Sequence, residues 1–241
     1  MSARDEIAPT GTLRVGINMA NMLLVTDREE DGTPVGVAPD MARELAARLD
    51  LPVTLHPYPR PGATADALAQ GAVDMVLIAD EAERAKTIAF SPAYCEIEAT
   101  YLVPEGSPLG TIDEVDSPGV RIAVAERAAY DLYLTRTLKE AELVRADGLP
   151  GAVELFRAEG LDALAGLRPA LTQNAEEIPG SRLLDGRYTT IRQAIGIAPG
   201  RREAADSVAD FCREARRSGF VAKLLERHGV ADRLSIPEEG D

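Results

Sequence analysis

The chain has 241 residues, of which 45% are hydrophobic and 27% are charged, and its formal net charge is -14. This length and composition suit a globular protein with one large domain or two smaller lobes. The negative charge argues against a nucleic-acid partner, because phosphate binding requires a basic surface. No segment approaches the roughly 18 apolar residues of a membrane span, so we expect no membrane insertion.

Cysteine and histidine are scarce, with two residues of each. Cys95 and Cys212 are too few for a disulfide framework, and we expect both to be reduced and not bonded to each other. No Cys/His cluster has metal-ligand spacing, and no phosphate-binding loop or nucleophile motif is present. The sequence therefore predicts no metal, no cofactor and no identifiable catalytic residue.

Short strands and helices alternate along the first hundred residues. Strands are expected at 13–17, 53–55 and 73–78, and helices at 41–51 and 63–70. Asp40 precedes the first of these helices and is predicted to cap its free N–H groups. Because strands and helices alternate, we expect parallel strands with helices on both faces of the sheet.

A second cycle of the same kind begins after Pro104. Strands are expected at 120–125, 142–144, 161–165 and 193–198, and helices at 127–138, 152–158, 169–177 and 203–228, the last interrupted at Ser218-Gly219. A short helix, a glycine and a strand led by aspartate occur twice, as ALAQGAVDMVLIA and LFRAEGLDALAGL. We therefore predict two similar α/β lobes, each with its own sheet, joined by crossing strands near 98–103 and 193–198.

Four segments carry a resemblance to a known family: GTLRVGIN, DGTPVGVAPDMARELAARL, AQGAVDMVLIADEAERAKTIAFSPAY and SVADFCREARRSGFVAKLLERHG. Together they resemble the type II solute-binding proteins of family 3, which bind polar amino acids for ABC importers. The resemblance implies a bilobal α/β fold of the periplasmic-binding-protein type, with lobe 1 formed by residues 1–102 plus 195–241 and lobe 2 by residues 103–194. It also implies a monomer that closes on a small polar or anionic ligand between its lobes, with an ABC transporter permease as a candidate partner.

Arg84 is the first candidate ligand-binding residue. It stands where amino-acid binders of this family grip the ligand carboxylate, a task that suits the planar, permanently charged guanidinium group. Asp80 occupies one of the positions before it, where those binders have Ser and Thr. The alternative is that Arg84 forms a surface ion pair with Glu81 or Glu83, which would contribute little.

Other departures from the family pattern supply further candidates. The first loop offers the amides of Asn18 and Asn21 in place of an aromatic ring, although asparagine there is also typical of turns. Glu126 and Arg127 replace a Gly-Thr pair, and Arg168 falls near the position of an acidic residue that meets the ligand amine. We expect Arg84, Arg127 and Arg168 to converge on the ligand, which these departures suggest is not an ordinary α-amino acid.

Glu96 and Glu98 are the remaining candidates and lie two residues apart on a crossing strand, hence on one face of it. A buried carboxylate is costly unless it is paired, so one of them is expected to meet a ligand cation or an arginine of the other lobe. The alternative is that this face is exposed to solvent.

A second function remains open, because cyclohexadienyl and chorismate dehydratases resemble solute-binding proteins. Such an enzyme needs a general acid, for which Glu96, Glu98 or Glu126 would serve if burial raised its pKa. The first residues contain no apolar signal-peptide segment, so the protein is expected in the cytoplasm as encoded, or in the periplasm if a signal peptide was removed.

Overall fold

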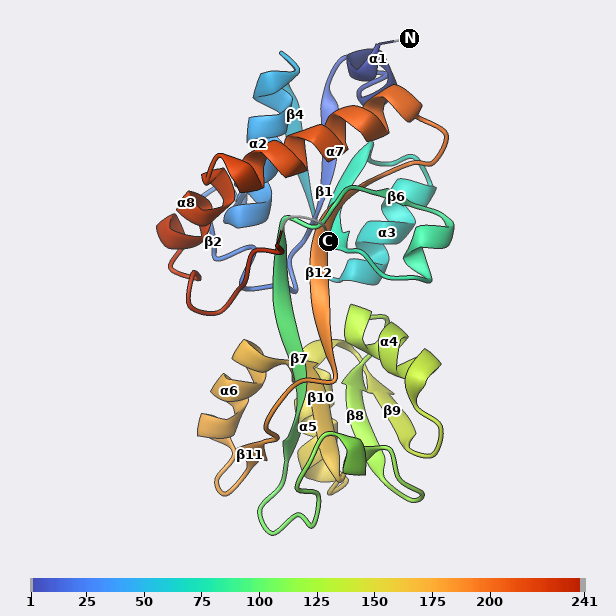
Figure 1. Cartoon of the computed structure of the whole chain (residues 1–241), viewed down its shortest axis with the longest axis vertical. Helices are drawn as coiled ribbons and strands as arrows, with labels where there is room; N and C mark the ends of the chain where they lie inside the picture. The colour runs from blue at the N-terminus through green and yellow to red at the C-terminus, as the bar shows by residue number, and fades with distance from the viewer. Residues whose placement is uncertain (1, 239–241) are drawn as a thin grey trace. The chain divides into compact units, whose positions relative to one another are not determined.

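The computed structural model describes residues 2–238 (Figure 1). The chain forms two compact units: unit 1 comprises Met1–Glu96 and Arg192–Asp241, and unit 2 comprises Ile97–Ile191. In Figure 1 unit 1 therefore combines blue and cyan segments with orange and red ones. Each division falls inside a strand that passes from one unit to the other, β7 (Cys95–Val103) or β12 (Thr189–Ile197). The expected boundaries, after residues 102 and 194, lie within the same two strands.

Unit 1 is built around three parallel strands. Its strands are β1 (Leu13–Asn18), β2 (Asp27–Arg28), β3 (Pro34–Val35), β4 (Val53–Tyr58), β5 (Met75–Ala79) and β6 (Ala89–Phe90). Its helices are α1 (Ala3–Ile7), α2 (Val37–Arg48), α3 (Pro61–Ala69), α7 (Arg202–Arg217) and α8 (Phe220–Arg227), with a 3-10 turn η1 (Arg84–Lys86). Strand β1 pairs in parallel with β4 and β5, as predicted, while β12 runs antiparallel to β5. The predicted interruption at Ser218-Gly219 separates α7 from α8 and is confirmed.

Unit 2 repeats this arrangement. Its strands are β8 (Arg121–Ala125), β9 (Glu142–Ala146), β10 (Ala163–Leu167) and β11 (Arg182–Leu183). Its helices are α4 (Ala129–Thr137), α5 (Gly148–Ala158) and α6 (Arg168–Glu177), with a 3-10 turn η2 (Asp113–Val115). Strand β8 pairs in parallel with β9 and β10, and β7 runs antiparallel to β10. A core of leucine, alanine and phenylalanine side chains packs between α5 and these strands.

The hydrogen-bonded strand order is continuous, β4-β1-β5-β12-β7-β10-β8-β9. We expected a separate sheet in each lobe, and this expectation is wrong. The reason is that the two crossing strands, β12 and β7, are neighbours in the ladder. The compact units follow the packing of helices onto strands rather than the limits of the ladder.

The repeated aspartate explains the internal similarity seen in the sequence. Asp74 precedes β5, and its carboxylate accepts hydrogen bonds from Arg14 N and Nε at 3.2 and 2.9 Å and from Nη2 at 2.8 Å. In unit 2, Asp162 precedes β10 and accepts from Arg121 N at 2.8 Å. Each aspartate also donates its own N–H to the carbonyl of the same arginine. The same pattern of aspartate–arginine hydrogen bonds therefore sets the register of the parallel strands in both units.

Helix α2 begins four residues earlier than predicted, at Val37 rather than at Met41. Its N-cap is Gly36, whose φ of 151° is in a region that favours glycine. A Cβ atom at Gly36 would lie 2.4 Å from the carbonyl oxygen of Leu24, so a side chain does not fit. Asp40 is thus a first-turn residue rather than the cap, because this glycine turn already starts the helix.

Both cysteines are free and buried, which confirms the prediction. Cys212 Sγ instead lies 3.2 Å from Ser91 Oγ. Nearby, the side chain of Tyr94 is fully buried, and its hydroxyl makes no hydrogen bond to any described residue. Burial raises the pKa of this phenol well above its usual value, so the hydroxyl stays neutral. A buried hydroxyl without a partner costs stability.

Tyr94→Phe should therefore leave the free energy of unfolding unchanged or raise it by up to about 1 kcal/mol, because it removes an unpaired polar group. Thr100→Val is the matched control, since Thr100 Oγ1 is buried and donates to the Leu184 carbonyl at 3.2 Å. That control should lower stability by about 1 kcal/mol. Urea unfolding of the three proteins measures both changes, and a loss above about 1 kcal/mol for Tyr94→Phe would contradict the assignment.

Candidate ligand-binding site

The carboxyl end of β5 carries the residues that the sequence singled out first. Strand β5 is buried throughout and ends at Ala79. Arg84 follows in the turn η1, is only 6% exposed and donates from Nη1 to the Ala79 carbonyl at 3.0 Å. Arg84 therefore does not lie at the surface, as the alternative reading required. Its contact with a ligand stays a prediction.

The burial of Arg84 changes one expectation. Truncating an exposed arginine would cost little stability, whereas Arg84 has its guanidinium inside the protein and hydrogen-bonded to the main chain. Replacing it would leave the Ala79 carbonyl without this donor, so Arg84→Ala is expected to lower stability as well as any ligand affinity. Arg84 thus fixes the turn that follows β5.

Asp80 and Glu96 flank an arginine that the sequence analysis missed. The register Gln193↔Ala79, continued by one residue, places Arg192 opposite Asp80, and Asp80 N donates to the Arg192 carbonyl at 2.9 Å. Directly opposed residues share a face of the sheet. On the other side, Arg192 Nε lies 3.9 Å from Glu96 Oε1. Three neighbouring strands therefore carry a row of carboxylate, guanidinium and carboxylate, all within unit 1.

The carboxyl group of Asp80 is half-buried at the edge of this row. Burial raises its pKa above the ordinary value, and the positive charge of Arg192 opposes the shift without cancelling it. A carboxyl group that has lost part of its hydration is stabilised when a hydrogen-bond donor binds to it.

The pKa of Asp80 is higher in the folded protein than in the unfolded chain, so protonation of Asp80 stabilises the folded state at acidic pH. This contribution is lost as the pH rises through the pKa that Asp80 has in the folded protein. In ligand-free protein, Asp80→Asn should therefore be more stable than the parent at neutral pH. The advantage should shrink as the pH falls towards 4. Thermal unfolding of both proteins across that range measures it, with Asp206→Asn on α7 as the control for loss of one exposed carboxylate. A difference that does not change with pH would refute the effect.

Asn18 and Asn21 lie at the end of β1 and in the loop after it. Asn18 Oδ1 accepts from Ala20 N at 3.1 Å, and Asn21 Oδ1 accepts from Leu23 N at 3.2 Å. These are asparagine turns, which is the alternative that the sequence left open. Any ligand contact from their amide nitrogens stays a prediction.

Glu98 pairs with two arginines in unit 2. Its carboxylate accepts from Arg168 Nε and from Arg187 Nη1, each at 2.8 Å, and its side chain is 41% exposed. Burial alone would raise the pKa of Glu98, but the two arginines outweigh it and lower the pKa. Arg168 also donates to the Gly186 carbonyl. Pairing with an arginine of the other lobe was expected for this strand, whereas Arg168 and Arg187 both lie in the same unit as Glu98. Arg187 was not recognised, because no sequence spacing relates it to Glu98.

Glu126 and Arg127 lie exposed at the turn between β8 and α4. Arg127 has a φ of 58°, a left-handed conformation that is unfavourable for a residue with a side chain. Its N–H donates to Asp131 Oδ2 at 2.8 Å, and Asp131, itself buried, also accepts from Arg145 Nε at 3.0 Å. The N–H group of Arg127 is therefore already hydrogen-bonded to a carboxylate of the protein itself, that of Asp131. Sequence reasoning missed Asp131 because it sits inside a helix pattern.

Two substitutions at Arg127 separate the stability cost of its left-handed backbone conformation from the contribution of its side chain. Arg127→Gly should be more stable than Arg127→Ala by about 1 kcal/mol, because both lack the guanidinium but only glycine adopts this φ freely. Urea unfolding of the two variants gives the difference directly. Equal stabilities would show that the turn relaxes when the side chain is shortened.

The described candidates fall into two groups. Unit 1 holds Asn18, Asn21, Asp80, Arg84 and Glu96, and unit 2 holds Glu98, Glu126, Arg127 and Arg168. Glu96 and Glu98 therefore belong to different units and pair with different arginines. The convergence of Arg84, Arg127 and Arg168 on one ligand stays a prediction.

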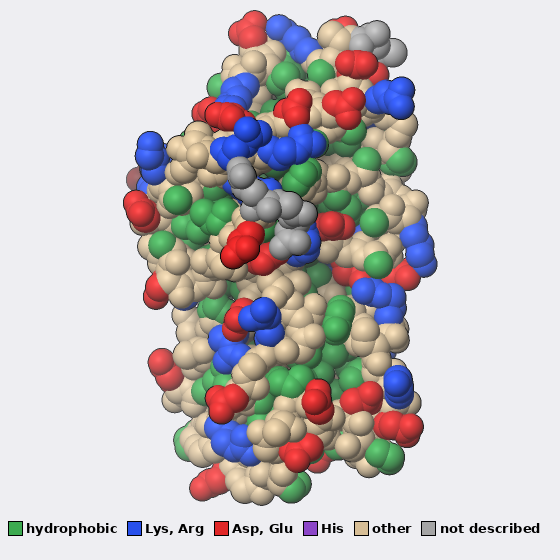
Figure 2. All heavy atoms as spheres, in the orientation of Figure 1, with side chains coloured by type: hydrophobic (Ala, Val, Ile, Leu, Met, Phe, Trp, Pro, Cys, Tyr) green, Lys and Arg blue, Asp and Glu red, His purple; other side chains and the backbone are tan. Residues whose placement is uncertain are grey.

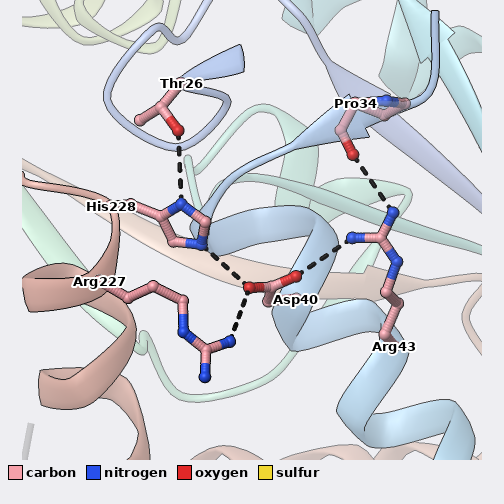
Figure 3. Close-up of polar contacts among 6 residues, drawn as sticks. All are labelled: Thr26, Pro34, Asp40, Arg43, Arg227 and His228. Atoms are coloured by element: carbon pink, nitrogen blue, oxygen red, sulfur yellow. Dashed lines mark hydrogen bonds and ion pairs between the residues drawn. The ribbon is translucent and has the colours of Figure 1, made fainter. Parts of the chain in front are cut away.

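A separate polar network joins α2 to α8 (Figure 3). Asp40 Oδ2 lies 2.9 Å from His228 Nε2, while Thr26 Oγ1 lies 3.4 Å from His228 Nδ1. Asp40 also pairs with Arg43 at 3.1 Å and Arg227 at 3.5 Å. The residue types are those of a hydrolytic triad, but Asp40 is shared among three partners and the threonine contact is long. The network fastens α8 to α2.

Within residues 2–238, no group of three or more His, Cys, Asp and Glu side chains could hold a metal ion. No helix of this part of the chain is long and apolar enough to cross a membrane. Figure 2 shows acidic and basic side chains interspersed over the face that it presents.

The fold is that of the type II periplasmic binding proteins, as solved structures show. An ancestral amino acid-binding protein, described as a precursor of cyclohexadienyl dehydratase, superposes with a TM-score of 0.75 at 23% identity over 94% of this chain and 99% of its own. A substrate-binding protein of an amino acid ABC transporter from Streptococcus pneumoniae, bound to L-arginine, gives 0.74 at 19% identity over 95% and 99%. A histidine kinase sensor domain with similarity to periplasmic binding proteins gives 0.77 at 17% over 94% and 98%.

Residues 13–231 match the family described as bacterial extracellular solute-binding proteins, family 3, and the chain belongs to this family. Among proteins with curated descriptions, none matches the chain. The protein is thus a solute-binding protein of family 3.

Proposed function

We propose that this protein binds a small polar or ionised solute and delivers it to the permease of an ABC importer, without transforming it. The observation that carries the proposal is the row of Asp80, Arg192 and Glu96 at the carboxyl end of β5, within a chain of the solute-binding family. Open α/β sheets bind ligands at the carboxyl ends of their strands. Half-buried charges there offer ionic contacts to a small molecule.

Two similar proteins have titles that name basic amino acids. One is bound to L-arginine, and another, a binding component of an ABC transporter from Wolinella succinogenes, is complexed with lysine. Identities of 19% and 20% carry the fold and not the ligand, so these compounds belong in a panel of candidates. Closure on the ligand, a monomeric state and the absence of a nucleic-acid partner complete the proposal.

The compartment is part of the same proposal. A solute-binding protein that serves an importer works outside the cytoplasm, whereas a sensor or carrier works inside it. Fractionation of cells that produce the natural gene product, followed by detection of this protein, separates the two locations.

The dehydratase alternative finds less support in the carboxyl groups proposed for it. A general acid at neutral pH needs a raised pKa, and the arginines that contact Glu98 lower its pKa instead. Glu126 is exposed. Burial does raise the pKa of Asp80, which is not one of the carboxyl groups proposed as the general acid.

A thermal-shift screen tests the proposal. The panel comprises the L-amino acids, small mono- and dicarboxylates, polyamines and shikimate-pathway intermediates. A solute at about 100 times its Kd stabilises the native state by about 2.7 kcal/mol, which corresponds to roughly 5–10 °C in a chain of this size. No shift with any compound would count against small-solute binding. Chemical conversion of a bound compound, followed by NMR, would instead establish the enzyme alternative.

A further inference from the structure

The segment that follows α8, residues 232–238, lies outside the part of the chain that matches the family, which ends at residue 231. It begins with a turn in which Arg233 N donates to the Val230 carbonyl at 3.0 Å. Leu234 is 8% exposed and Pro237 is buried, whereas Ser235 between them is exposed. Two apolar side chains therefore hold this segment in the fold of unit 1.

Ser235 pairs with the start of the crossing strand β7. Glu96 N donates to the Ser235 carbonyl at 2.8 Å, and Ser235 N donates to the Glu96 carbonyl at 3.0 Å. Two hydrogen bonds exchanged between the same two residues are those of an antiparallel sheet pair. In Figure 1 the red end of the chain runs to the green start of β7. The segment therefore extends the hydrogen-bonded ladder by one residue pair.

This pair lies on the edge of β7 that β10 also uses. On the other edge, next to β12, the Ala99 carbonyl accepts from Tyr188 N at 3.1 Å. Main-chain groups of successive strand residues point to alternate edges, so Glu96 faces the β10 edge. Strand β10 pairs with β7 from Ala99 to Leu102. Ser235 thus continues the pairing of that edge beyond the end of β10.

Two residues of β7, Ile97 and Glu98, lie between the pair made by Glu96 and the first pair made with β10, at Ala99. The division of the chain into its two units falls between Glu96 and Ile97. A strand that is hydrogen-bonded on both edges resists bending, because a bend would break those bonds. A small number of residues usually absorbs the backbone change when two units move. The strap pair at Glu96 therefore leaves Ile97 and Glu98 to bend.

The other end of the segment is fixed to the body of unit 1. Helix α8, from which it continues, is fastened to α2 by the contact of His228 Nε2 with Asp40 Oδ2 at 2.9 Å. Val230 is fully buried, and its N–H donates to the Leu225 carbonyl at 2.9 Å. A restraint on Glu96 by Ser235 is therefore a restraint by the helices of unit 1.

We propose that residues 232–238 form a strap that fixes the start of β7 to unit 1 and confines the bending of this strand to Ile97 and Glu98. The strap thereby limits the motion of the two units relative to each other. Without it, bending would spread along β7 towards Cys95 and would widen the range of distances between the units. The strap acts in the ligand-free protein, so its effect is measurable whether or not a solute binds.

Spin labels on one exposed residue of each unit report this motion. Asp206→Cys on α7 and Glu154→Cys on α5 supply the labelling sites, while the native Cys95 and Cys212 are buried and should not react. Pulsed electron paramagnetic resonance then gives the distribution of distances between the labels. Removal of residues 232–241 should widen this distribution by more than the scatter between repeated preparations.

Ser235→Pro is the more selective test, because proline has no N–H group to donate to the Glu96 carbonyl. Ser235→Ala is the matched control, since it keeps the N–H group and removes only an exposed hydroxyl group. Ser235→Pro should widen the distance distribution, and Ser235→Ala should reproduce that of the parent.

A segment that only stabilises unit 1 would give a different result. The shortened chain and Ser235→Pro would then lower Tm but keep the distance distribution of the parent, and the strap would be refuted. A parent distribution already as wide as that of the shortened chain would refute it equally. If the shortened chain does not fold, an unchanged distribution for Ser235→Pro is sufficient to reject the strap.

Discussion

The aspartate that opens the central strand of each unit determines where the site residues lie. Asp74 binds Arg14 through its side chain and its main chain, and Asp162 does the same to the backbone of Arg121. A buried carboxylate is tolerated only where donors surround it, so each strand has one favourable register against its parallel neighbour. In unit 1 that register sets where β5 ends, and with it the positions of Asp80 and the turn that holds Arg84.

Ion pairing also distinguishes several arginines of this protein from Arg192. Arg14, Arg145 and Arg168 each meet a carboxylate at hydrogen-bonding distance and so stabilise their own unit. At the turn before α4, Asp131 accepts the Arg127 N–H, so the protein supplies its own anion there. Arg192 departs from this rule. Its Nε atom is buried without a hydrogen-bond partner among the described residues, and Glu96 Oε1 lies 3.9 Å away.

Membership of the solute-binding family and the departures from its amino-acid binders are compatible on this view. The family fold positions strand ends, whereas the residues at those ends decide which molecule is bound. Here the expected arginine is engaged by the main chain of its own turn, and a second arginine comes from the crossing strand β12. A ligand site can move from one element to its neighbour without any change in the strands that support it.

The sequence alone determined the α/β class, the two cycles, the family and the parallel pairing around β1 and β8, because hydrophobic periodicity and the repeated Gly and Asp are local signals. It also placed Asp80 and Arg84 after the end of a buried strand, and Glu96 and Glu98 on a crossing strand. Tertiary structure alone decided that Arg84 is buried, that Gly36 rather than Asp40 begins α2, and that Glu98 meets Arg187. It also brought Arg192 between Asp80 and Glu96. These contacts join residues that are far apart in the chain, through strand register and side-chain burial, and no spacing in the sequence records such distances.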